Sequence, residues 1–466
     1  MKSRLMLARV EFLLKDFAAC EDLLKAEVVI RESSRRVSDS DLGVALNFLG
    51  EQYYLSGRHA MAEPVYERAI EIRRLTYPRG HRLMGEMANR LAVIKSASGN
   101  YLESDPLFRE ALACLEETYG PEHPEVSRAL NDLAESLFAQ NKLEPARRLL
   151  ERALNIQERS LRVNDARISR TRSNLAAVYV ARGRYPEAVR LYEKDISLRQ
   201  SQSLPDRTAL ATSLNNLAEA LRSLGRYSEA EKCLIQALGL REQLVGKEHP
   251  HVAQILSNLG YLYLHQHRHD EAIELLERAL RVRESCLSPN HPQIMTTLGT
   301  LAEVQFSAGQ YAEARPHFVR ALQIAQSTFG ERHPQVLGLQ VASARNEFRL
   351  GHLGRAELML NRSRSVIDEV LGPDHRVSAR CMLGLAELAQ KEKRYDAAFP
   401  WLERSLAIVQ TTTACARREH AEILRLIAEN LFARNLPVEA LERAEQLAEI
   451  QREILPPDHG DVIHTW

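Results

Sequence analysis

The sequence predicts an all-α protein, a solenoid of about eleven helix-turn-helix hairpins. Three observations predict this fold class. Residue types recur with a period of 42 residues along the whole chain, with no insertion or deletion. Apolar residues inside each period follow the three- and four-residue spacing of a helix face. The 466 residues include 21 glycines and 18 prolines, fewer helix breakers than average, which favours long helices.

The period is visible in one short phrase. GRYPEA at 183–188 recurs as GRYSEA at 225–230 and as GQYAEA at 309–314. Steps of 42 from the tyrosine of this phrase give one anchor residue per repeat. The anchors are Phe17, His59, Tyr101, Leu143, Tyr185, Tyr227, His269, Tyr311, Leu353, Tyr395 and Pro437.

Two positions of each repeat carry small side chains. The residue three places after the anchor is Ala in nine repeats, Cys20 in the first and Ser104 in the third. The residue nine places before the anchor, such as Ala218, is always Ala or Gly, and Leu217 represents the aliphatic position beside it. Small residues let two helices approach closely. Each repeat is therefore predicted to be a helix A, a tight turn and a helix B, followed by a longer loop.

The longer loop has its own periodic chemistry, as in GPEHPEV at 120–126 and GERHPQV at 330–336. Its glycines are expected to end helix B in the left-handed conformation; they are Gly120, Gly246, Gly330 and Gly372. Its prolines suit the first turn of helix A; they are Pro124, Pro250, Pro292 and Pro334. One histidine recurs per loop, which favours a structural junction or capping role over a catalytic or metal-binding one. These are His81, His123, His249, His291, His333, His375 and His459.

The spacing of Leu217, Ala218, Ala230, Leu234 and Ala237 resembles the core of the tetratricopeptide repeat (TPR). The usual unit has 34 residues, and the longer unit here is similar to the 42-residue repeats of kinesin light chains and of bacterial and nephrocystin-like proteins. The resemblance spans essentially the whole chain and implies a right-handed superhelix with helix A on its concave face. Kinesin light chains also carry a long heptad coiled coil. This sequence has none, so their cargo-adaptor function is not carried over.

The repeat count sets the expected domain organisation. Residues 1–466 are expected to form a single continuous solenoid, with 1–36 as a partial first repeat, 37–456 as ten repeats and 457–466 as the start of a further helix. Terminal repeats normally carry a polar cap, and Trp466 is not polar. We therefore expect continuation into a longer array or end-to-end self-association.

Composition excludes several classes of protein. Lys and Arg total 62, as do Asp and Glu, so the formal net charge of zero argues against a nucleic-acid-binding protein. The apolar runs are far shorter than the roughly 18 residues of a membrane span, and charges interrupt the apolar residues at the N-terminus. Six cysteines without a C-x-x-C motif indicate a reducing compartment, and a cytoplasmic protein is expected.

The residues do not form a recognisable catalytic constellation. The sequence lacks G-x-S-x-G, the phosphate-binding G-x-x-x-x-G-K-[ST] and H-E-x-x-H, and the six cysteines occupy six different phases of the repeat. The segment HQHRHD at 265–270 has the composition of a metal-binding tract, but it spans a predicted A-to-B turn, and an exposed turn is the favoured interpretation. No enzymatic activity, cofactor or metal is expected.

The remaining candidate site is the concave face. By the family's pattern, the residues twelve and eight places before each anchor point into it. The first set contains a row of asparagines: Asn47, Asn89, Asn131 and Asn215. A carboxamide both donates and accepts, so such a row can hold an extended peptide backbone, as inner-face asparagines of the family do. The alternative, that these side chains only bond neighbouring repeats, stays open. Because the row lies in the N-terminal half, that half is the preferred groove.

The second inward set contains six glutamates, including Glu135 and Glu219. Three basic residues lie near the asparagine row and are expected to offset this charge, so the groove has mixed sign: Arg90, Arg128 and Arg170. Asparagines one phase further on are predicted to join neighbouring repeats: Asn174, Asn216 and Asn258. An aromatic phase could anchor a partner, although packing between helices is favoured: Tyr54, Phe138, Phe306, Phe348 and Phe432.

The sequence therefore predicts a non-enzymatic scaffold that binds a peptide or protein segment along the concave helix-A face. The alternative is a sensor or regulatory segment of a larger signalling protein, such as a signalling ATPase with its catalytic domain outside this chain.

Overall fold

Twenty-two helices and no strand occur within the residues that the computed structural model describes, namely 2–13, 17–33, 40–55, 58–76, 82–163, 165–201, 206–410 and 417–454. The predicted all-α class and the number of hairpins are confirmed. The helices are α1 (Lys2–Leu13), α2 (Phe17–Ser33), α3 (Ser40–Leu55), α4 (His59–Thr76), α5 (Arg82–Ala97), α6 (Tyr101–Tyr119), α7 (Pro124–Ala139), α8 (Leu143–Ser160), α9 (Ala166–Ala181), α10 (Tyr185–Gln200), α11 (Arg207–Ser223), α12 (Tyr227–Val245), α13 (Pro250–His265), α14 (His269–Cys286), α15 (Pro292–Ser307), α16 (Tyr311–Phe329), α17 (Pro334–Arg349), α18 (Leu353–Val370), α19 (Arg376–Lys391), α20 (Tyr395–Gln410), α21 (Arg417–Ala433) and α22 (Pro437–Ile454).

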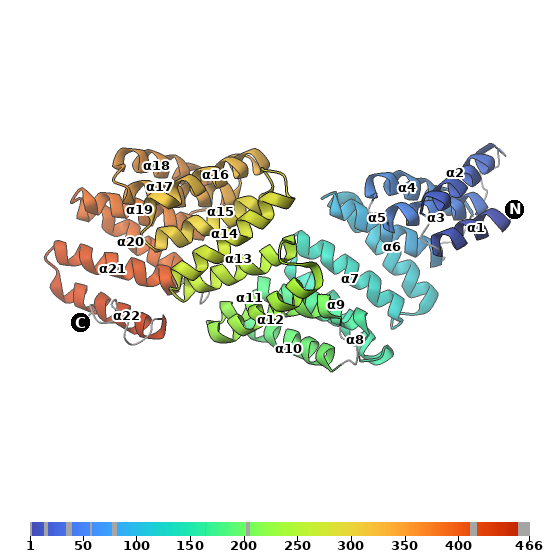
Figure 1. The fold of residues 1–466 in the computed structure, drawn as a ribbon, viewed down its shortest axis with the longest axis horizontal. Coiled ribbons are helices and arrows are strands. Elements are labelled where there is room, and N and C mark those ends of the chain that lie inside the picture. Colours follow the sequence, from blue (N-terminus) through green and yellow to red (C-terminus); the bar gives the residue numbers. More distant parts are fainter. Residues whose placement is uncertain are drawn as a thin grey trace. The chain divides into compact units, whose positions relative to one another are not determined.

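The helices divide into two compact units, Met1–Gln202 with α1–α10 and Ser203–Trp466 with α11–α22. Within each unit every odd-numbered helix packs most closely against the even-numbered helix that follows it (Figure 1). The expectation of one continuous solenoid over 1–466 stays a prediction, and 457–466 lies outside the described residues.

Every even-numbered helix begins at the anchor residue that the period predicts, from Phe17 in α2 to Pro437 in α22. From α6 onward, the turn before it depends on the residue two places earlier, which has a positive φ. Glycine occupies this place in several repeats, as in Gly225 with φ 76°. Where glycine is absent, residues such as His267 (φ 60°) adopt the same conformation. The turn geometry is then kept at a cost in conformational free energy, because a side chain disfavours a positive φ. His267 in the histidine-rich segment is thus a turn residue.

The small residues predicted at the helix contact are buried. The residue three places after the anchor is at most 7% exposed in all eleven repeats. Gly260 shows how close the helices come, because a Cβ added to it would lie 2.7 Å from Leu276 Cγ and 3.2 Å from the Ala272 carbonyl oxygen. Of the residues nine places before the anchor, Ala428 alone is half-buried rather than buried. The repeat core is therefore set by side-chain size at two positions.

Histidine caps begin five of the odd-numbered helices. At α7 the Nδ1 atom of His123 accepts the backbone N–H of Glu125 at 3.2 Å, with proline at the first helical position. His249, His291, His333 and His375 cap their helices in the same way. Asp165 and Asp206 replace histidine before α9 and α11. The predicted junction role is thus confirmed for these five histidines, whereas His81 and His459 lie outside the described residues.

The glycines after helix B need one correction. Gly120, Gly246 and Gly330 have φ values of 79–84°, as predicted, but their ψ values of 155–165° are extended rather than left-handed helical. The extended ψ directs the chain out into the loop instead of continuing the helical turn. This region of backbone space is essentially restricted to glycine, so the requirement is stricter than a left-handed cap.

Candidate functional site

In the first unit the predicted residues converge because α5, α7 and α9 pack side by side. Asn131 and Glu135 lie one turn apart on α7, and the Arg170 guanidinium from α9 reaches Glu135 Oε1 at 2.9 Å. Asn174, also on α9, donates to Glu135 Oε1 at 2.5 Å and to Asn131 Oδ1 at 3.3 Å. These four residues form one hydrogen-bonded cluster. Its exposed members are Glu135 and Arg170, whereas Asn131 is 3% exposed.

Asp132 extends this cluster toward α5 and was missed by the sequence reasoning. Its carboxylate accepts from Asn89 Nδ2 at 2.7 Å and from Arg170 at 3.3 Å. Burial raises the pKa of the Asp132 carboxyl above its usual value. Asp132 occupies the same phase as Asn174 and Asn258, and that shared polar phase was the signal that could have found it.

Two of the three predicted arginines pair with inward glutamates, Arg90 with Glu51 at 2.7 Å and Arg170 with Glu135 at 2.9 Å. Arg128 instead pairs with Glu125 of its own helix at 3.1 Å, which is not one of the inward glutamates. Asn47 on α3 is half-buried, and in the described part of the chain no hydrogen bond or ion pair joins it to the cluster.

The asparagines bond between neighbouring repeats, as the alternative interpretation required. Asn174 donates to Asn131 and Asn258 donates to Asn215, each across 43 residues, which confirms the predicted inter-repeat role of Asn174 and Asn258. Asn216 instead accepts from Asn215 of its own helix at 3.4 Å. These bonds leave further hydrogen-bonding capacity, since Asn89 Oδ1 is buried without a partner. Whether the row also holds a ligand stays a prediction.

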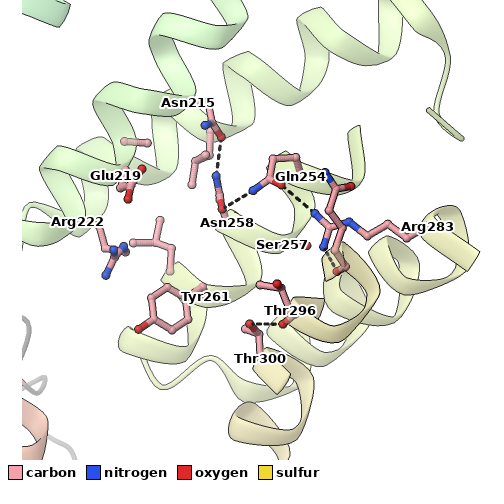
Figure 2. A pocket seen from close by; sticks show the side chains of 14 residues that line it. Asn215, Glu219, Arg222, Gln254, Ser257, Asn258, Tyr261, Arg283, Thr296 and Thr300 are labelled. Carbon is pink, nitrogen blue, oxygen red and sulfur yellow. Dashed lines mark hydrogen bonds between the residues drawn. The ribbon is translucent and has the colours of Figure 1, made fainter. Parts of the chain in front are cut away.

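In the second unit a cavity of about 530 Å³ lies along α11, α13 and α15 (Figure 2). On α11 it is lined by Asn215, Glu219 and Arg222, which share one face at helical spacing. Ser257 and Tyr261 of α13 line it in the same two phases as Asn215 and Glu219, one repeat later. Residues from both of the predicted inward positions of the repeat therefore line this one cavity.

The cavity combines several kinds of group. The Arg222 guanidinium lies 4.8 Å from the ring centroid of Tyr261, a cation–π distance, and Glu219 is exposed beside it. Thr296 and Thr300 of α15 add hydroxyls. No group of three or more His, Cys, Asp or Glu that could hold a metal ion occurs among the described residues. The arrangement offers hydrogen bonds and an aromatic surface.

Ion pairs bridge the inward positions of the last repeats. Arg345 of α17 pairs with Glu387 of α19 at 3.1 Å and with Glu422 of α21, 77 residues away, at 2.5 Å. Arg380 of α19 reaches Glu303 of α15 at 3.3 Å, also across 77 residues. Charged side chains two repeats apart thus pair with one another, and these charges are neutralised within the fold.

The aromatic side chains that share one repeat position fall into a packed group and an exposed group. Tyr54, Phe306 and Phe348 pack against core clusters, as predicted. Phe138 and Phe432 are 38% and 73% exposed, so the packing prediction is wrong for them.

The exposure of Phe138 follows from its neighbours. Tyr311 and Arg345 cover the Phe306 ring, with the Tyr311 centroid at 5.4 Å and the Arg345 guanidinium at 5.7 Å. The equivalent residues beside Phe138 are Leu143 and Ala177, which are smaller. Phe138 is therefore left partly uncovered.

A family model described as "Tetratricopeptide repeat" matches the chain over 83–159, 167–243, 210–285, 251–327, 293–369 and 344–411. No curated protein gives a significant match. Among the described residues, no helix is long and apolar enough to cross a membrane.

Solved structures of similar proteins include a putative kinesin light chain from Podosopora anserina with nearly identical TPR-like repeats. It is 27% identical, with 45% of this chain and 99% of that chain covered and a TM-score of 0.39. BtubC (BKLC) from P. vanneervenii is 25% identical, with 54% and 92% covered and a TM-score of 0.40. The apo form of RapI is 12% identical, with 79% and 98% covered and a TM-score of 0.59, a likeness of fold.

Proposed function

Since the chain belongs to the tetratricopeptide repeat family, whose repeats form protein-interaction scaffolds, we propose that it binds an extended peptide or protein segment along its helix-A face. The observation that carries the proposal is the cavity along α11, α13 and α15, where both inward phases meet. We further propose that the scaffold acts in the cytoplasm, in keeping with its low cysteine content. We also propose that it has no enzymatic activity and no cofactor.

An extended backbone presents N–H and C=O groups to both sides, and these groups need partners when they leave water. The carboxamides of Asn215 and Asn258 and the hydroxyl of Thr300 are suited to that need. Tyr261 adds an aromatic surface against which one side chain of the partner can pack. The proposed binding mode thus combines sequence-tolerant backbone contacts with one apolar contact.

The exposed Glu135–Arg170 pair of the first unit is a second candidate contact surface, on α7 and α9. The inner positions near Arg345 are less suited, because a ligand would have to replace buried ion pairs that already satisfy each charge. We therefore expect binding to centre on the cavity.

The test is selection of peptides from a random 12-residue phage-displayed library against the purified chain, followed by affinity measurement with synthetic peptides. Combined Asn215→Ala and Tyr261→Ala substitution should weaken the selected peptides at least about tenfold, because hydrogen bonds and aromatic packing are both lost. Arg281→Ala, at an exposed position on α14, is the matched control and should leave affinity unchanged. Failure to select any peptide, or equal binding by the double variant, would refute the proposal.

The alternative function, a regulatory segment of a larger signalling protein, needs a catalytic domain outside this chain. The full-length gene sequence separates the two: a flanking phosphate-binding loop would favour the alternative.

A further inference from the structure

Two ion pairs in the second unit join odd-numbered helices that lie two repeats apart. Glu303 of α15 pairs with Arg380 of α19 at 3.3 Å, and Arg345 of α17 pairs with Glu422 of α21 at 2.5 Å, each across 77 residues. The bonds between odd-numbered helices described above for the first unit span 35–43 residues, so they join adjacent repeats. Because side chains reach across an intervening repeat, the second unit is curved toward these helices.

A pair that skips a repeat depends on curvature in a way that a pair between adjacent repeats does not. Adjacent repeats keep their packed interface when the array bends, so a bond across that interface changes little in length. A bond between helices two repeats apart lengthens as soon as the repeats rotate away from one another. The two pairs overlap between α17 and α19, so together they hold four consecutive repeats, from α15 to α21, in one curvature (Figure 1).

Each arginine of these pairs has a second carboxylate on an adjacent repeat. Arg345 also pairs with Glu387 at 3.1 Å, and Arg380 lies 3.7 Å from Glu419. Loss of a pair that skips a repeat therefore leaves neither arginine without a counter-charge, which is the costly outcome for a buried ion. The curved state and a more open state thus differ mainly by two ion pairs, a difference that solution conditions can shift.

The two glutamates that would be released are accessible to water and salt. The Glu303 and Glu422 side chains are 35% and 28% exposed, whereas Arg345 is 7% exposed. Partly exposed carboxylates are hydrated readily when they lose a partner, and dissolved salt screens their attraction to an arginine. The pairs are therefore sensitive to ionic strength, although the core between the repeats is not.

We propose that Glu303–Arg380 and Arg345–Glu422 form an electrostatic brace. At low ionic strength the brace holds the repeats of α15–α21 curved and shields Arg345, and at high ionic strength it opens and makes this face accessible. The inference goes beyond the proposed function, because it concerns the conformation of the chain without a partner.

The structure supplies a variant that removes the brace alone. Combined Glu303→Gln and Glu422→Gln substitution keeps the shape of both side chains but removes both charges, while Glu387 and Glu419 still neutralise the arginines. Glu419→Gln is the matched control, because it removes a pair between adjacent repeats, with Arg376 at 2.9 Å, and leaves both pairs of the brace in place.

The first measurement is the distance between spin labels at Thr296 of α15 and Glu429 of α21, two exposed positions. The labels are attached through p-acetylphenylalanine, so the native cysteines are kept, and the distance is measured by double electron–electron resonance. Shifts of about 1–2 Å at one helix interface are ordinary. Over the interfaces between α15 and α21, we expect the double variant to exceed wild type and control by about 3–6 Å at low salt. Wild type should lengthen toward the double variant at about 1 M salt, where the Debye length is about 3 Å.

The second measurement reports access to the face itself. Phenylglyoxal modifies exposed guanidinium groups, and mass spectrometry after proteolysis gives the rate at each arginine. Arg345 should react faster in the double variant than in wild type at low salt. Arg241, which is 9% exposed and bonded to Thr212 outside the brace, should react at the same rate in both proteins.

The outcomes are distinct from those of peptide selection, since neither measurement needs a partner. An unchanged label distance in the double variant overturns the brace, and so does an Arg345 rate equal to that of wild type. A wild-type distance that stays constant between low and high salt overturns the response to ionic strength, and this arm does not depend on the folding of any variant. Equal lengthening in Glu419→Gln also overturns the proposal, because any lost ion pair would then loosen the unit.

Discussion

Replacing Ala218 by Leu tests the packing rule on which the whole array depends. Ala218 is 1% exposed on α11, in the phase that faces helix B. One repeat later the same phase is Gly260, where even an added Cβ would lie 2.7 Å from Leu276 Cγ. The contact therefore has no room for an isobutyl group. Overpacking of this kind costs about 1–3 kcal/mol, and we expect a loss of folding stability in that range for Ala218→Leu.

The assay is urea unfolding followed by circular dichroism, combined with hydrogen exchange resolved by peptide. Because each repeat packs mainly against its neighbours, lost protection should concentrate in α11, α12 and the adjacent hairpin of the second unit. Ser228→Leu, an exposed position on α12, is the control and should change stability by less than about 0.5 kcal/mol. An Ala218→Leu protein as stable as the control would mean that Ala218 does not lie at a tight helix contact, and the reasoning from repeat phase would be refuted.

Three further outcomes are expected. His123→Ala should destabilise α7 by about 1 kcal/mol in urea unfolding through loss of its cap, and His123→Asp should restore stability, since aspartate caps other repeats; equal stability of all three proteins would contradict the cap. Hydrogen bonding to Arg147 is the main cause that lowers the pKa of Glu144 to about 2, so its contribution is present above about pH 4.5 and is lost as the pH falls toward 2. The melting temperatures of wild type and Glu144→Gln should therefore converge over that interval, and a gap that widens instead would oppose the assignment. Combined replacement of Asn89, Asn131 and Asn215 by Ala should weaken selected peptides while the circular dichroism spectrum stays helical, and unchanged affinity would remove the asparagine row as a binding element.

The sequence by itself was sufficient for the architecture. Each helix B starts at its predicted anchor, the small residues such as Ala230 are buried, and His123 and His249 cap helices at the predicted junctions. These features act over a few residues, or between the two helices of one hairpin. Residue type and spacing therefore suffice to predict them. Because the same position recurs in every repeat, each prediction rests on many copies of one pattern. The ψ angle of Gly120 is extended, not left-handed helical as the sequence predicts. This angle depends on the direction of the following loop, which the local sequence does not determine.

The candidate site depended on contacts that no local pattern records. Asp132 joins Asn89 to Arg170, hydrogen bonds through Gln254 and Asn258 join Arg283 to Asn215, and Arg345 reaches Glu422 across 77 residues. Each contact links side chains one or two repeats apart, so it depends on how far each repeat is rotated against the next and on the size of intervening side chains. The sequence thus determined that the chain is a helical repeat array and supplied the phases that are predicted to face inward. Only the tertiary structure decided which of these charges neutralise one another and where a cavity remains along α11, α13 and α15.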